Sequence, residues 1–497
     1  MLAIYKRELK SYFRSFIGFL FIAVTLFFLG LYFSVYNLMN GYPYFAYVVS
    51  SVTFLFMLTV PILTMRILAE EKRSKTDQLI LTAPVSVGGI VMGKFLALLT
   101  IFAIPVAIIC FYPLIMAQYG SVPMGEAYLS ILAYFLFGMT AIAIGLFLSS
   151  VTESQVIAAV LTFLVLFLGY MMDSICSIIS STGNLLTKLL RCFDLYTPFS
   201  NLLNGTLDVS SIVYYVSVTA LVLFLTVQSI QKRRYSMSVK NLSFSAYSTG
   251  MIAVAVALVV VVNIIMGEMP SSWTAIDMTS QKLYSLTDQT VDYVKNMQDD
   301  VTIYVLVNQD NQDTTLGQTL QRYDDLSDHI TVEYVDPTVN PMFYAQYTTG
   351  NISTNSLIVV SDKRSKVIDY NDVYESSYDF DYSTYSYNTT TTGYDGEGQI
   401  TSALDYVLND DMPKVYMTTG HNELSLSNTF TSALNKENVD YETVNLMDLD
   451  AIPDDAACLF INGATSDFSS DDKDKVIDYL NNGGKVILVT GYTDEET

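Results

Sequence analysis

The chain has 497 residues, 51% of them hydrophobic, and a formal net charge of −23, so it is too long for one compact core and we expect several domains. Lys and Arg outnumber Asp and Glu by 15 to 9 over residues 1–266, whereas residues 267–497 hold 11 basic and 40 acidic residues. The first part fits a membrane domain with a basic face. The acidic second part excludes nucleic acid as a partner, because phosphates require Lys and Arg.

The four cysteines exclude two common kinds of site. The chain has no C-x-x-C pair, so neither a zinc ribbon nor a thioredoxin-type redox centre is indicated. Cys176 and Cys192 share a predicted outer loop, where a disulfide and two unpaired thiols both remain open, the thiols being favoured.

Residues 1–15 predict an amphipathic helix. Tyr5, Leu9 and Tyr12 fall on one face, and Lys6 and Lys10 fall on the other. Such a helix lies in the headgroup plane with its basic face on anionic lipid, so membrane lipid is an expected partner. The apolar run that follows is too long for a cleavable signal peptide, and no small-residue cleavage site follows it.

Seven apolar segments of about 20 residues, the length that crosses a bilayer, predict seven membrane spans. They lie at about 16–38, 46–65, 95–117, 127–149, 155–172, 211–229 and 246–266. With the N-terminus inside, cytoplasmic segments hold 13 Lys and Arg and outer loops hold only Lys188 and Arg191. This bias predicts a cell-membrane protein with a cytoplasmic N-terminus and with residues 267–497 extracytoplasmic.

The loop between the second and third spans, residues 66–94, is charged and predicts an amphipathic helix that Pro84 ends. A solvated connection explains such charge as well as a partner-docking element does. The sequence from Glu70 to Ala97, however, resembles the first cytoplasmic loop of ABC-2 type exporter permeases, with an acidic pair, basic residues, a Thr, a Leu-rich turn, a Pro and Gly-Lys. By that resemblance the loop docks an ATPase subunit.

The resemblance implies a set of ATPase-coupling residues in this loop and in the turn between the fourth and fifth spans. They are Glu70, Glu71, Lys72, Arg73, Thr76, Leu79, Pro84, Thr152 and Glu153.

One glycine-rich stretch, Gly88 to Phe95, imitates a phosphate-binding loop. It has Phe95 where Ser or Thr would hold magnesium, and no buried strand precedes it. We therefore expect no catalytic residue, cofactor or metal in this chain. ATP and Mg²⁺ are expected on a separate ABC ATPase, and a second permease chain or a homodimer is expected beside it.

The second half reads as α/β sequence. Residues 272–309 resemble the start of the extracytoplasmic part of the auxiliary subunit of the gliding-motility ABC transporter, through Asp277, Thr279, Lys282 and Tyr284. The element order over 271–375 suits a thioredoxin-like scaffold. Residues 376–398 are rich in Tyr, Ser and Thr and predict a linker or mobile outer loop.

Residues 396–427 resemble the auxiliary subunit again, with a strand that ends in Gly-His-x-Glu at Gly420 to Glu423. His421 and Glu423 are candidates for an extracytoplasmic site, since ligands bind beyond the carboxyl ends of strands in open sheets. A turn that caps the next helix is the favoured explanation of these residues, and two groups do not make a metal site. Residues 399–497 predict a Rossmann-like domain, which is shorter here than in the auxiliary subunit.

The sequence thus predicts a fusion of an α-helical polytopic membrane domain with extracytoplasmic α/β domains. Residues 1–241 form the six-span permease, 242–270 the seventh, anchoring span, and 271–375 and 399–497 the two α/β domains. The predicted function is the permease subunit of an ABC-2 exporter with an auxiliary domain. An anchored extracytoplasmic binding or structural module that transports nothing is the alternative, and an outer-face hydrolase using His421 and Glu423 is a third.

Overall fold

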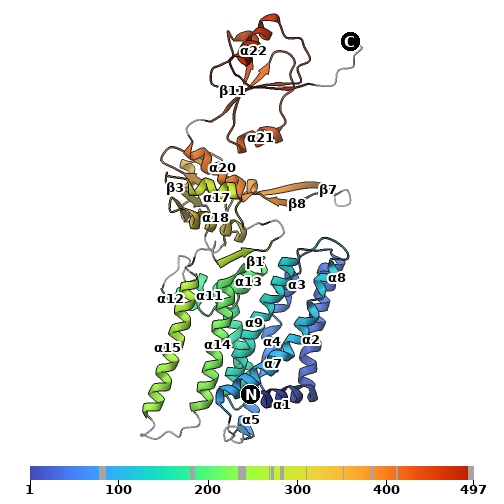
Figure 1. The fold of residues 1–497 in the computed structure, drawn as a ribbon, viewed down its shortest axis with the longest axis vertical. Helices are drawn as coiled ribbons and strands as arrows, with labels where there is room; N and C mark the ends of the chain where they lie inside the picture. The colour runs from blue at the N-terminus through green and yellow to red at the C-terminus, as the bar shows by residue number, and fades with distance from the viewer. Residues whose placement is uncertain are drawn as a thin grey trace. The chain divides into compact units, whose positions relative to one another are not determined.

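The computed structural model divides the chain into two units, Met1–Ser285 and Leu286–Thr497 (Figure 1). The structure describes residues 1–77, 85–179, 185–232, 242–267, 269, 274–279, 282, 285–308, 311–350, 352–381, 386–409 and 412–490.

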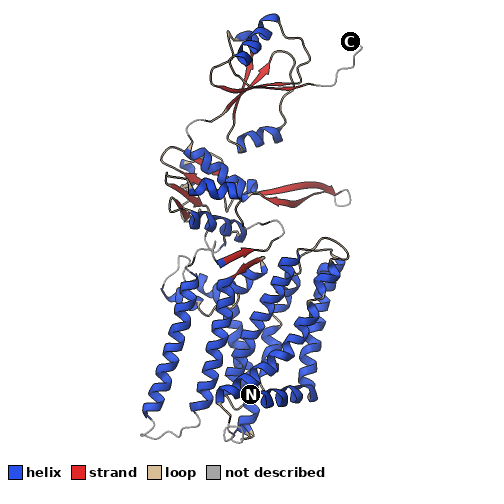
Figure 2. Cartoon of the chain, in the orientation of Figure 1, coloured by secondary structure: helices blue, strands red, loops and turns tan. Residues whose placement is uncertain are grey.

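The first unit is helical, apart from one short pair of strands (Figure 2). Its elements in chain order are α1 (Leu2–Arg14), α2 (Phe16–Phe33), the π-helix η1 (Ser34–Met39), α3 (Ala46–Thr53), α4 (Phe56–Thr64), α5 (Ala69–Arg73), α7 (Val87–Ile109), α8 (Tyr112–Met116), α9 (Met124–Val151), α10 (Gln155–Tyr170), α11 (Met172–Ile179), α12 (Leu185–Arg191), α13 (Thr197–Leu203), β1 (Thr206–Asp208), α14 (Val209–Lys232), α15 (Leu242–Gly267) and β2 (Ala275–Asp277).

Within the described residues, five helical segments are long and apolar enough to cross a membrane: Phe16–Met39, Val87–Met116, Met124–Val151, Val209–Lys232 and Thr249–Gly267. The predicted second span is a pair of helical segments bent by 59° at a short break, and counting it as one span makes six. The predicted fifth span, α10, has only 16 residues. It is about 24 Å long, which is shorter than a ~30 Å hydrocarbon core.

The helix α9 lies at the centre of this unit, and small residues bring its neighbours close. A Cβ atom on Gly138 would lie 2.4 Å from the Phe102 ring of α7, and one on Gly145 would lie 2.2 Å from Thr64 of α4. These glycines allow close helix packing, since any side chain there would displace a neighbouring helix.

The amphipathic helix expected at residues 1–15 is confirmed as α1, which lies crosswise to α2 at one end of the bundle (Figure 1). Tyr12 is buried and donates a hydrogen bond to the Leu63 carbonyl at 2.9 Å. Lys6 and Lys10 are exposed, so α1 turns its aromatic face to the bundle and its basic face away from it.

The segment that follows α15 returns to the helical bundle. Strand β2 pairs antiparallel with β1, with Leu207 opposite Ile276. Asn263 of α15 also donates to the Ser217 hydroxyl of α14 at 2.9 Å. The residues after the last long helix of this unit are thus hydrogen-bonded to the chain between α13 and α14.

The second unit holds two four-stranded sheets and a hairpin. Its elements are α17 (Asp288–Lys295), β3 (Val301–Val305), α18 (Thr314–Leu326), β4 (Ile330–Tyr334), the 3-10 helix η4 (Tyr344–Gln346), β5 (Leu357–Val360), β6 (Ser365–Ile368), α19 (Tyr370–Val373), β7 (Tyr374–Asp381), β8 (Ser386–Tyr394), α20 (Gly396–Leu408), β9 (Lys414–Thr419), α21 (Asn428–Lys436), β10 (Asp440–Asn445), the 3-10 helix η5 (Leu446–Asp448), β11 (Ala456–Asn462), α22 (Ser470–Asn481) and β12 (Val486–Val489).

The first sheet has the order β4-β3-β5-β6, in which β3 and β4 are parallel and the other pairs are antiparallel. Helix α20, which the sequence assigns to the following domain, belongs to this core. Its Ile400, Ala403, Leu404 and Val407 are fully buried with Ile303 and Leu357. The spacing i, i+3, i+4, i+7 makes one apolar face, and that face is buried against this first core.

The predicted linker at 376–398 is instead largely a β-hairpin, in which Tyr374–Asp381 pairs antiparallel with Ser386–Tyr394 (Figure 2). Tyr and Thr favour extended backbone, although the segment lacks aliphatic residues. The base of the hairpin is anchored because the Tyr374 hydroxyl donates to Asp313 at 3.0 Å and the Tyr394 hydroxyl bonds Thr319 at 2.7 Å.

The second sheet is entirely parallel, with the order β10-β9-β11-β12. The chain leaves β9 for β10 on one side and then crosses to β11 on the other side. The carboxyl ends of β9 and β11 therefore form the topological switch point, where open parallel sheets usually bind ligands.

Candidate functional site

Three helices at one end of the first unit meet at a buried ammonium group. Lys94, in the second turn of α7, is fully buried. Its Nζ lies 3.1 Å from Glu8 Oε1 of α1, 2.9 Å from Glu71 Oε2 of α5 and 3.0 Å from the Ile67 carbonyl. An ammonium has three hydrogens to donate, so each hydrogen has an acceptor and the buried charge is compensated.

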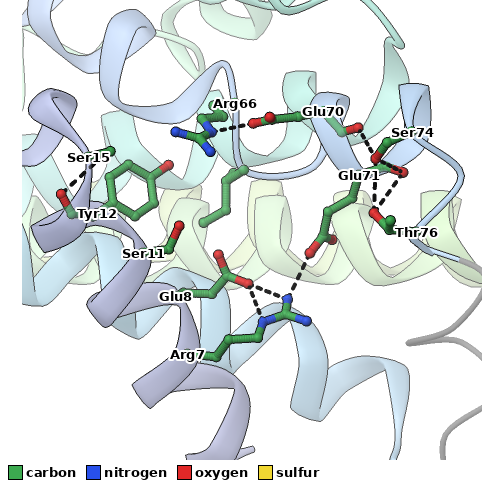
Figure 3. A pocket seen from close by; sticks show the side chains of 11 residues that line it. Arg7, Glu8, Ser11, Tyr12, Ser15, Arg66, Glu70, Glu71, Ser74 and Thr76 are labelled. Atoms are coloured by element: carbon green, nitrogen blue, oxygen red, sulfur yellow. Dashed lines mark hydrogen bonds and ion pairs between the residues drawn. The ribbon is translucent and has the colours of Figure 1, made fainter.

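A second cation completes this cluster. Arg7 donates to Glu8 and, at 2.8 Å, to Glu71 Oε1, as Figure 3 shows. Two carboxylates and two cations therefore neutralise one another, and Glu8 is only 8% exposed. Breaking such a pair leaves an uncompensated charge, which is far more costly than losing an exposed ion pair.

The start of α5 is tied to the end of α9 by a single hydroxyl. Ser149 Oγ accepts from the backbone N–H groups of Leu68 and Ala69 at 3.2 and 3.1 Å, and it donates to the Met65 carbonyl at 3.2 Å. Lys72 Nζ donates to the Val151 carbonyl at 3.1 Å. Its ammonium also lies 3.4 Å from the Glu153 carboxylate. The loop is thereby attached to α1, α7 and α9 together.

Beyond these contacts, the described part of the loop contains an exposed segment, residues 73–76, which we call the tip. Arg73, Ser74, Lys75 and Thr76 are all exposed, and Lys75 has a positive φ of 58°. The Thr76 hydroxyl bonds Ser74 at 3.0 Å. Beneath the tip lies an open cavity of about 260 Å³, lined by Arg7, Glu8, Tyr12, Arg66, Glu70 and Glu71 among others (Figure 3).

The structure separates the predicted coupling residues into two groups. Glu70, Glu71 and Lys72 are held by contacts within the chain: Glu70 pairs with Arg66, Glu71 with Lys94, and Lys72 with Glu153. Arg73 and Thr76 point to the exposed tip.

Of the remaining predicted coupling residues, Thr152 and Glu153 follow α9 in the turn that the Lys72 side chain contacts. Leu79 and Pro84 lie outside the described residues. The predicted amphipathic helix is therefore seen only as the five residues of α5.

Sequence reasoning missed the two residues at the centre of the cluster, Glu8 and Lys94. Both carry a signal in the sequence. Glu8 is the one acidic residue in a basic helix, and Lys94 stands inside a long apolar stretch, where a charge is costly unless it is paired. The P-loop-like glycines precede Lys94 within helix α7, and Gly93 packs against Met1 and Ile4 of α1.

The second candidate site, at His421 and Glu423, lies at the switch point of the parallel sheet, directly after β9. The structure adds Asp472 from the first turn of α22. His421 Nε2 lies 3.3 Å from Asp472 Oδ2, and Nδ1 lies 3.6 Å from Glu423 Oε1. The ring stacks on Phe468 with 4.1 Å between centroids.

All three polar side chains of this second cluster are buried, with at most 5% of each exposed. Burial alone would raise the pKa of Glu423, but the backbone N–H groups of Glu423 and His421 hold that pKa below its usual range. The pKa of Asp472 is also lowered, chiefly because the Ser469 hydroxyl donates to it. Both carboxylates are therefore ionised beside the imidazole at neutral pH.

The His421 carbonyl accepts from the backbone N–H groups of Thr465 and Ser466, each at 3.1 Å, so this residue joins the loops that follow β9 and β11. Ser469 caps α22 through the Asp472 N–H. The Ser-x-x-Asp spacing is a helix-start signal that the sequence analysis did not connect to His421.

No group of three or more His, Cys, Asp and Glu in the described part of the chain has an arrangement that could hold a metal ion. No disulfide joins Cys176 and Cys192.

The apolar helices define the first unit as a multi-pass membrane domain. Residues 5–230 match the family model described as ABC-2 family transporter protein. This match supports a permease of an ABC exporter, a membrane component that is not catalytic on its own and that works with an ABC ATPase.

Residues 280–373 match a second family model, described only as a domain of unknown function, DUF7088. This match does not confirm the resemblance to the gliding-motility auxiliary subunit. No curated protein matches the chain.

The Lys94 cluster predicts a large effect of Lys94→Met. The change keeps the length of the side chain but leaves the buried Glu8 and the half-buried Glu71 with only Arg7 beside them, which costs about 3–5 kcal/mol. We expect a clearly lower thermal unfolding midpoint for the solubilised protein. Lys6→Met, which removes an exposed ammonium from α1, is the matched control. Equal midpoints for the two variants would contradict the account of the cluster.

The His421 cluster predicts an acid-sensitive domain. A carboxylate with a lowered pKa stabilises the fold above the pKa of the unfolded chain, about 4, and that stability is lost as the pH falls through the folded pKa. Ser469→Ala removes the donor to Asp472, so the pKa of Asp472 rises towards its value in the unfolded chain and the stability lost on acidification becomes smaller. It also removes a helix cap worth about 1 kcal/mol.

Amide hydrogen exchange of peptides from 412–490 in the full chain, corrected for intrinsic rates, measures how much protection is lost as the pH falls. Ser427→Ala removes the matched cap of α21, where the hydroxyl accepts from the Phe430 N–H. It should weaken protection by a similar amount without moving its pH dependence. A parallel pH profile for both variants would refute the role of Asp472.

Proposed function

We propose that the membrane unit is the permease subunit of an ABC-2 type exporter, and that a separate ABC ATPase docks on the exposed tip of residues 73–76 and on the turn at Thr152 and Glu153. The observation that carries this proposal is the ion cluster around Lys94. It fixes the base of an otherwise exposed loop, so that a force applied to the tip is passed on to the helices beneath it.

The mechanism follows from the attachments of α5. Glu71 connects α5 to Lys94 of α7 and to Arg7 of α1, and Ser149 connects the start of α5 to α9. Closure of an ATPase dimer on the tip would tilt these three helices as one group. ATP binding then favours one of two arrangements of the bundle, which is a population shift between states that both exist without ATP. Two such permease units, from a homodimer or a related chain, would enclose the path.

The second unit is proposed to be an extracytoplasmic auxiliary part. The basic bias of the loops supports a cytoplasmic N-terminus. With α10 counted as a crossing, the chain crosses seven times, and α15 returns it to the outside as an anchoring span. The order β4-β3-β5-β6 supports a thioredoxin-like arrangement, and the parallel sheet β10-β9-β11-β12 supports a Rossmann-like one. A permease followed by two such α/β domains favours a fusion of a permease with an auxiliary subunit like that of the gliding-motility ABC transporter.

The test is copurification of the tagged chain from its native membrane with mild detergent. We expect a stoichiometric ATPase with a P-loop to copurify with the chain. Arg73→Glu reverses an exposed charge at the tip and should reduce the recovered ATPase at least tenfold without changing the thermal midpoint. Arg14→Glu, on the exposed face of α1, should leave recovery unchanged.

Two results would contradict the proposal. If the chain copurifies with surface components only, it is an anchored binding or structural module. If Arg73→Glu and Arg14→Glu behave alike while an ATPase is present, docking occurs elsewhere than at the tip.

A further inference from the structure

A second cavity of the membrane unit lies at the other end of α9. Its volume is about 310 Å³, and helix α9, with 28 residues and a length of about 42 Å, separates it from the Lys94 cluster. Residues from several elements line it, including Tyr44, Tyr47, Glu126, Tyr196, Asn204 and Thr279. The cavity thus belongs to the end of the bundle that the charge bias places outside.

The fold brings Glu126 and Thr279 together beside Gly205. Gly205 has a φ of 88°, and its carbonyl accepts from the Met278 N–H at 3.0 Å. A Cβ on Gly205 would lie 2.7 Å from the Thr279 methyl group and 3.0 Å from the Glu126 side chain. The pairing of β1 with β2 therefore places the segment after α15 against the first turn of α9.

Three tyrosines, Tyr44, Tyr47 and Tyr196, form part of the wall. The ring centroid of Tyr47 lies 6.3 Å from that of Tyr44 and 5.9 Å from that of Tyr42. Tyr44 and Tyr47 are 39% and 55% exposed, as tyrosines at a membrane–water interface often are. Ring faces are thus left available at a cavity.

The charge of this cavity selects among ligands. None of the described residues that line it is Lys or Arg, and Glu126 is the one carboxylate among them. An anion would be repelled there. A neutral polyol would donate hydrogen bonds to the carboxylate but would leave its charge uncompensated. An organic cation gains both from the carboxylate and from the negative faces of the tyrosine rings.

We propose that this cavity binds the ammonium group of an organic cation, between the Tyr44 and Tyr47 rings and the Glu126 carboxylate. Burial raises the pKa of Tyr44, and the nearby Glu126 charge raises it further, as a negative potential at this wall requires. The inference rests on the proposed permease function in one respect: only in an exporter would the bound cation represent the class of transported substrate. Binding itself needs no ATPase.

The test measures equilibrium binding of radiolabelled choline to the full chain in phosphatidylglycerol nanodiscs, which contribute no ammonium group. Its neutral isostere, 3,3-dimethylbutan-1-ol, has the same shape without the charge. We expect saturable choline binding and displacement by the isostere only at concentrations at least tenfold higher. Equal displacement by the isostere, displacement by the neutral polyol sorbitol, or no choline binding would overturn the proposal.

The variants assign the binding to these side chains. Glu126→Gln should weaken choline binding about tenfold, and Tyr47→Leu should weaken it about 3- to 30-fold. Tyr47→Phe keeps the ring and should bind within about twofold of the native chain. Asp173→Asn and Tyr119→Leu, which change residues of the same unit that do not line the cavity, should bind normally. If Tyr47→Phe loses as much as Tyr47→Leu, the hydroxyl and not the ring carries the binding.

The source of the ammonium group is distinguished by competition. Displacement of choline by dihexanoyl phosphatidylcholine at a lower concentration than by choline itself, and not by dihexanoyl phosphatidylglycerol, would assign the site to a lipid headgroup. Preference for free choline would assign it to a soluble cation. Failure of choline to bind while an ATPase copurifies would reject this inference alone, whereas binding without an ATPase would reject the exporter and keep the site.

Discussion

The membrane unit depends on one buried positive charge. Lys94 is enclosed completely, and an unpaired ammonium in such a place would not be tolerated. Its acceptors come from α1 and from the loop that holds α5, so neither can leave without exposing or stranding a charge. A loop that composition alone describes as solvated is for this reason fixed to the bundle at its base, while residues 73–76, its tip, are exposed. Rigidity at the base and exposure at the tip are the two properties that a docking element for a motor needs.

Much of this architecture was predictable from local sequence. The apolar runs, the N-terminal amphipathic helix and the strands such as Val301–Val305 and Ile330–Tyr334 follow from periodicity and composition. These features are determined by residues that are close together in the sequence, so local patterns of hydrophobic and polar residues predict them. The loop residues came from a resemblance, which located the element but did not distinguish the residues fixed within the chain from those exposed at the tip.

What the sequence did not reveal depends on contacts between distant residues. Lys94 looked like the last basic residue of a loop, because its partner Glu8 is 86 residues away. The Tyr- and Thr-rich segment looked like a linker, because its pairing and its anchor on Asp313 become evident only in the fold. Helix α20 was assigned to the wrong core, because the spacing of its apolar residues predicts a buried face but does not show which sheet that face covers. Asp472 was missed because it reaches His421 only when β9 and β11 lie side by side.

The account gives the two ends of α9 different partners, a motor at the end that carries Ser149 and a cargo at the end that carries Glu126. Site-specific photo-crosslinking in the native membrane tests this most directly, with a benzophenone side chain at position 73 or at position 119. Tyr119 is 80% exposed and lies just after α8, away from the tip. The account predicts an adduct with a P-loop ATPase from position 73 and none from position 119. An ATPase adduct from position 119, or none from position 73 while the ATPase is present, would contradict it.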